Sequence, residues 1–69
     1  MFEQFEGMLV SEAIQKLEIM GFDYEVIEDE FDGQYIEIDC TECDGEECSA
    51  VMLAITNGII EYYEPMGWI

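Results

Sequence analysis

Hydrophobic residues recur at helical spacing in the first third of the chain. Between Val10 and Met20 they fall at positions i, i+3, i+4, i+7 and i+10, which is the stripe of an amphipathic helix. Ser11 has the side chain of an N-cap residue, and Gly21 stands where a left-handed C-cap is expected. The pattern therefore predicts a helix over residues 11–20.

After this helix the period changes to two, which indicates strands. Apolar and polar positions alternate over residues 22–27 and again over residues 35–40, and the turn signal Asp32-Gly33 separates the two runs. A β-hairpin is predicted, with Tyr24 opposite Ile38 and Val26 opposite Ile36 on its apolar face. Four carboxylates would then share the other face: Asp23, Glu25, Glu37 and Asp39.

A second hairpin is predicted near the C-terminus. Residues 50–55 are continuously apolar, as in a central strand, and Asn57-Gly58 is a strong signal for a type I′ turn. Pro65 is expected to end the last strand. Residues 66–69, which follow Pro65, would then cover an edge of the sheet or the core. The pairings that this turn predicts are Ile55 with Ile60 and Leu53 with Tyr62, which would leave Glu61 and Tyr63 pointing outward.

Together these elements predict a single α+β domain over residues 1–69. One N-terminal helix would pack on an antiparallel sheet of about four strands with two hairpins. A chain of 69 residues is near the lower size at which a hydrophobic core alone holds a fold. Residues 1–8 do not indicate one particular element.

The charge of the chain is strongly one-sided. Asp and Glu number 18, Lys and Arg number 1, and the formal net charge is −17. Disordered acidic chains also lack hydrophobic residues, whereas hydrophobic residues make up 51% of this chain, so we expect it to fold. The sign of the charge excludes nucleic acid and anionic membranes as partners, and it leaves basic proteins and cations.

Most of the acidic residues lie in one stretch of the chain. Like charges placed across strands destabilise a sheet, so folding alone gives no reason for such a cluster, whereas a basic partner surface does. We therefore predict a carboxylate array that binds a basic protein, with Glu61 and Glu64 adding to it and with Tyr35 and Tyr63 as outward aromatic anchors. The acidic residues of the stretch are Asp23, Glu25, Glu28, Asp29, Glu30, Asp32, Glu37, Asp39, Glu42, Asp44, Glu46 and Glu47.

A comparison with DNA gives this array a scale. Duplex DNA carries one charge per about 1.7 Å, so 17 charges match roughly 29 Å of duplex. A folded domain of this length has an expected radius of gyration near 11 Å, and hence a diameter of about 28 Å. The protein is therefore expected to carry about as much negative charge across its width as DNA carries over the same length.

In these respects the chain resembles the small, very acidic, phage-encoded DNA mimics that inhibit host defence, among them anti-CRISPR and anti-restriction proteins. The resemblance covers size, charge density and the α+β fold, and it rests on no sequence motif because that class shares none. It implies a stoichiometric inhibitor without a cofactor, a monomer or small homo-oligomer in the bacterial cytoplasm. Its partner would be a basic nucleic-acid-binding protein of the host, such as a defence nuclease or a CRISPR surveillance complex. Uracil-DNA glycosylase inhibitors are a related class.

Catalysis has little support in the sequence. The chain has no His and one basic residue, so the usual nucleophile and base pairs are absent. General acid–base catalysis by two carboxyl groups needs a cleft, which a domain of this size hardly offers. We predict a binding protein and not an enzyme.

The cysteines suggest an alternative function, that of a small metal-binding or redox domain. Cys40, Cys43 and Cys48 have the spacing C-x2-C-x4-C, but a structural zinc site needs four ligands, so an acidic residue would have to complete this one. The competing interpretation makes Cys40 and Cys48 small apolar core residues. An odd number of cysteines without an export signal indicates a reducing compartment. A third possibility is an acidic adaptor of another basic protein.

A partial calcium-loop pattern runs from Glu28 to Asp39. It places acids at loop positions one, three, five and twelve and Gly33 at position six. Position one is Glu instead of Asp, position twelve is Asp instead of Glu, and the flanks alternate as strands do. We therefore expect a hairpin here and not a calcium site.

Overall fold

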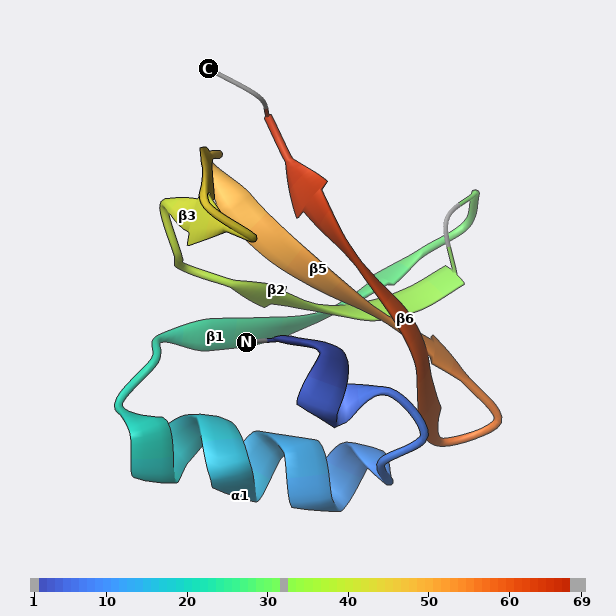
Figure 1. The fold of residues 1–69 in the computed structure, drawn as a ribbon. Helices are drawn as coiled ribbons and strands as arrows, with labels where there is room; N and C mark the ends of the chain where they lie inside the picture. Colours follow the sequence, from blue (N-terminus) through green and yellow to red (C-terminus); the bar gives the residue numbers. More distant parts are fainter. Residues whose placement is uncertain (1, 32, 68–69) are drawn as a thin grey trace.

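The structure, a computed structural model, describes residues 2–31 and 33–67 and has an α+β fold. A four-stranded antiparallel sheet in the order β1-β2-β5-β6 packs against a helix, and β3 and β4 pair in a small second sheet (Figure 1). The predicted fold class is confirmed. In chain order the elements are η1 (a 3-10 helix, Phe2–Phe5), α1 (Val10–Met20), β1 (Tyr24–Asp29), β2 (Gly33–Ile38), β3 (Glu42–Cys43), β4 (Glu46–Glu47), β5 (Ala50–Thr56) and β6 (Ile59–Met66).

Helix α1 begins one residue earlier than predicted. Its N-cap is Leu9, whose backbone is extended and whose side chain makes no capping hydrogen bond, so the predicted N-cap Ser11 was wrong. Tertiary backbone contacts fix the start instead: the N–H of Val10 donates to the carbonyl of Gly58 at 3.0 Å. The C-cap prediction is confirmed, because Gly21 is left-handed with φ of 82°.

The hydrophobic core lies between the sheet and the two helical elements, which are on the same side of it (Figure 1). Ala13 and Leu17 of α1 are fully buried against the sheet. Phe2 and Phe5 of η1 are also 0% exposed, and this gives the N-terminal residues a definite role. The remaining buried members are Ile36, Ile38, Cys43, Cys48, Val51, Leu53 and Ile60.

The register of the first hairpin is as predicted. Tyr24 lies opposite Ile38 and Val26 lies opposite Ile36. The acidic stretch that follows forms a short hairpin of its own, β3–β4, with left-handed residues at Asp44 and Gly45 in its turn.

The register of the second hairpin corrects two predictions. Ile55 lies opposite Ile60 as expected, but an irregularity between Ala54 and Ile55 shifts the pairing so that Leu53 meets Tyr63 instead of Tyr62. The Tyr63 ring therefore faces the core, with its centroid 6.3 Å from that of Phe2. It does not point outward.

Pro65 does not end the last strand, because it lies within β6 and pairs with Val51. β6 is an edge strand of the sheet, where a residue without an N–H is tolerated. Met66, the first of the residues predicted to cover an edge of the sheet or the core, belongs to β6 instead, and positions 68–69 lie outside the described residues. Over the described ranges, no helix has the length and apolar character needed to cross a membrane.

We predict that salt stabilises this fold. The formal net charge is −17, so the acidic side chains repel one another in the folded state. Salt screens this repulsion, because the Debye length falls from about 30 Å at 0.01 M salt to about 3 Å at 1 M. Each kcal/mol of relieved repulsion raises the melting temperature of a domain this size by about 4–8 °C. Thermal melts in a chloride series should show the rise, and a flat series would contradict it.

Candidate functional site: a carboxylate face on the sheet

The first hairpin brings four carboxylates together on one face. Glu25 of β1 lies opposite Glu37 of β2, and the N–H of Asp39 donates to the carbonyl of Asp23 at 2.9 Å. The four residues, with Tyr24, line a shallow depression of about 200 Å³. We call them the carboxylate quartet.

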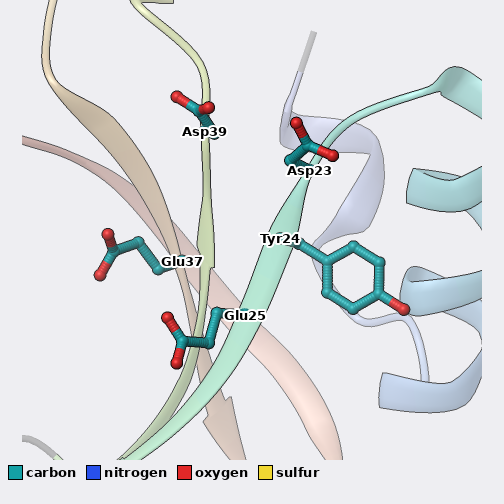
Figure 2. Close-up of a pocket in the computed structure, with 5 residues that line it drawn as sticks. All are labelled: Asp23, Tyr24, Glu25, Glu37 and Asp39. Carbon is teal, nitrogen blue, oxygen red and sulfur yellow. The ribbon is translucent and has the colours of Figure 1, made fainter.

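The close-up view shows how these side chains diverge. The side chains of Glu25 and Glu37 extend to one side of the hairpin, Asp23 and Asp39 lie at its base, and the ring of Tyr24 extends towards the helix (Figure 2). The hydroxyl of Tyr24 donates to a carboxylate oxygen of Glu18 on α1 at 2.7 Å. Tyr24 therefore belongs to the helix side of the sheet and marks the boundary of the quartet.

The sheet register extends the acidic face beyond this hairpin. Across the four strands, Glu25, Glu37, Met52 and Glu64 are successive partners. Three of the four positions in this row are acidic. Glu64 therefore belongs to the same face as the quartet although it is separated from it by more than twenty residues of sequence.

No basic side chain neutralises this face. Lys16 is the chain's one Lys or Arg, and it lies on α1, which packs on the opposite side of the sheet. Like charges directly opposite each other cost a sheet some stability. The acidic residues also have a possible structural explanation. Charges on an edge strand such as β1 prevent the edges of two sheets from pairing and aggregating. That explanation accounts for β1 and not for Glu37, which is on a central strand.

The other predicted array residues are not part of the quartet. Glu28 and Asp29 are the last residues of β1, Glu30 lies in the turn that follows, and Asp32 lies outside the described residues. Four more are in or next to the β3–β4 hairpin, and Glu61 is on β6. The predicted array is thus divided among the first hairpin, the β3–β4 hairpin and β6. The β3–β4 members are Glu42, Asp44, Glu46 and Glu47.

The aromatic anchors also differ from the prediction. Tyr35 is only 9% exposed, so it offers little surface to a partner, and Tyr63 faces the core. Among residues 2–31 and 33–67 the exposed aromatic residues are Tyr62 at 44% and Phe31 at 93%. The sequence carried a signal for Phe31, an aromatic residue between acids at a turn, but none for Tyr62, whose orientation depends on the irregular pairing.

Tyr63 connects the β3–β4 hairpin to the main sheet. Its hydroxyl donates to Oδ2 of Asp44 at 2.9 Å. This hydrogen bond, with burial as a second cause, raises the pKa of Tyr63 from its ordinary 10 to about 12. Asp44 therefore has a structural partner inside the protein, unlike the acids of an open binding face.

A pH dependence follows from the raised pKa. The native state keeps the Tyr63 proton at a pH where the unfolded chain has lost it, so this contribution to stability is complete below about pH 10 and disappears as the pH rises to about 12. We expect Tyr63→Phe to remove the loss of stability over that window. Urea unfolding of both proteins between these pH values measures it, and parallel pH profiles would contradict the assignment.

The cysteines mostly contribute to the core. Cys43 and Cys48 are 2% and 0% exposed, and burial raises the pKa of both thiols. Cys40 is half-buried, and its thiol donates to the carbonyl of Glu42 at 3.1 Å. Within residues 2–31 and 33–67, no three Cys, His, Asp or Glu side chains are grouped to hold a metal ion.

The calcium-like segment is a hairpin. Its first residues end β1 and residues 33–38 form β2, so the polypeptide does not wrap around a central point as a calcium loop does.

Comparison of the chain with protein-family models, curated proteins and solved structures finds no match.

Proposed function

We propose that the protein is a DNA mimic that inhibits a nucleic-acid-binding protein of a bacterial host by occupying its DNA site. The proposed target is a defence nuclease or a CRISPR surveillance complex. The observation that supports this most directly is the carboxylate quartet. Four acids share one face of a hairpin, and the chain's one basic side chain is on the helix across the sheet.

The charge density supports the same proposal. The molecule extends 31 × 29 × 18 Å, and a duplex with one charge per about 1.7 Å carries about 18 charges over 31 Å. The protein carries a formal charge of −17 over the same distance. Carboxylates two residues apart on a strand lie roughly 6.7 Å from each other, which suits a groove whose Lys and Arg side chains are spaced to meet successive phosphates.

The mechanism requires no chemistry by the inhibitor. Lys and Arg side chains of the partner would form charge-assisted hydrogen bonds with the carboxylates, and long-range attraction would speed association. The partner could not bind DNA while its groove is occupied. The inhibitor would act stoichiometrically in the compartment of its target, the bacterial cytoplasm.

A cleavage assay tests the proposal. Purified restriction endonucleases and CRISPR effector complexes are assayed on their DNA substrates with increasing amounts of the protein. We expect complete inhibition of at least one enzyme near a 1:1 ratio, with relief by excess substrate DNA. Inhibition that excess DNA does not relieve would contradict mimicry of DNA.

A further inference from the structure

The sheet face that carries the quartet also carries a row of apolar side chains. Ile27, Tyr35, Ala54 and Tyr62 are successive partners across the four strands. This row lies beside the acidic row, two residues along each strand. The face is therefore acidic in one row and apolar in the next.

Tyr62 is the most accessible member of the apolar row, at 44% exposed. Ala54, its cross-strand partner, has no side chain large enough to cover the ring. Glu64 follows two residues later on the same face, roughly 6.7 Å along the strand. Glu61 precedes Tyr62 and lies at the irregular pairing between β5 and β6. Its carboxylate accepts a hydrogen bond from the hydroxyl of Thr56. Tyr62 is thus an exposed aromatic residue with Glu64 next along the same face and Glu61 beside it in sequence.

We propose that Tyr62 and Glu64 form a subsite for an arginine side chain of the partner. A guanidinium is planar, so it can stack on the Tyr62 ring while it donates two hydrogen bonds to the Glu64 carboxylate. The ammonium of lysine is a compact, strongly hydrated charge and cannot make the same pair of contacts. Charge complementarity selects a basic partner, and the ring beside the carboxylate selects arginine. This inference rests on the proposed function and defines the chemistry of the target's groove.

Peptides of equal charge test the subsite. The affinities of hexa-arginine and hexa-lysine for the protein are measured by isothermal titration calorimetry at one low salt concentration. The ratio of the two affinities is the observable, and Tyr62→Leu should lower it about two- to fivefold, the range expected for a cation–π contact at an exposed site. Tyr62→Phe keeps the ring and should keep the ratio.

Two further variants locate the effect. Phe31→Leu removes a second exposed aromatic residue near acids and should leave the ratio unchanged. Glu64→Gln should lower the ratio as Tyr62→Leu does, because the bidentate contact is lost. The circular dichroism spectrum of each variant is compared with that of the wild type before titration.

The outcomes separate this inference from the proposed function. A ratio that Tyr62→Leu leaves unchanged, or that Phe31→Leu lowers instead, overturns the arginine subsite. Neither result affects inhibition of a nuclease that DNA relieves. Weak binding of both peptides with an unchanged ratio in the Glu25→Lys, Glu37→Lys, Asp39→Lys variant would support separate roles for the quartet and for Tyr62.

Discussion

Reversing three charges of the quartet should abolish inhibition of the target enzyme. The variant Glu25→Lys, Glu37→Lys, Asp39→Lys changes the net charge by +6, from −17 to −11, and puts ammonium groups where the target's own Lys and Arg side chains would lie. Close charge pairs at protein interfaces have coupling energies of about 1.5–7 kcal/mol. Losing three such pairs weakens binding by roughly a thousandfold or more. The concentration for half-inhibition in the cleavage assay measures it.

A control variant distinguishes the position of the charges from their number. Glu3→Lys, Glu6→Lys, Glu12→Lys makes the same change in net charge at exposed positions on or near η1 and α1, away from the quartet. This variant should lose much less inhibition, and the loss should come from slower association. If both triple variants inhibit equally, the binding surface is not the quartet.

Truncating Leu53 should destabilise the protein strongly. Leu53 is 0% exposed on the central strand β5, in the cluster that joins the sheet to the helical elements. Leu→Ala in a core costs about 2–5 kcal/mol, and a domain of this length has a total stability of about 3–10 kcal/mol. We therefore expect Leu53→Ala to remove a large share of the total stability. Urea unfolding followed by circular dichroism gives the free energy.

Leu9→Ala is the matched control. Leu9 is 50% exposed, and its role at the start of α1 is played by its backbone, so truncation should cost less than about 1 kcal/mol. Equal losses for the two variants would mean that the core is not where the structure places it.

The main elements of the fold were predictable because each has a single strong signal. The 3.6-residue period predicted α1, and the αL position of Gly21 followed from its place after the last apolar residue. The alternation on both sides of the first turn fixed the β1–β2 register, which in turn predicted that Glu25 and Glu37 share a face. This part of the candidate site depends on local sequence alone.

Features that depend on tertiary contacts were not predictable. No Gly or Pro next to Ala54 indicates the shifted pairing in the sequence. The shift exchanged the orientations expected for Tyr62 and Tyr63. The helix start at Val10 depends on a backbone bond to Gly58, and not on a capping side chain. Burial of Phe2 likewise depends on the sheet beneath it and has no periodic signal.

The central claim is that the protein takes the place of DNA on a basic partner, and competition measures this most directly. Fluorescent duplex DNA is bound to an enzyme that the protein inhibits, and the protein is added over a series of salt concentrations. We predict complete displacement of the duplex, with an affinity that falls steeply and linearly on a logarithmic salt scale, as it does for DNA itself. Simultaneous binding of the protein and the duplex to the enzyme would contradict the claim.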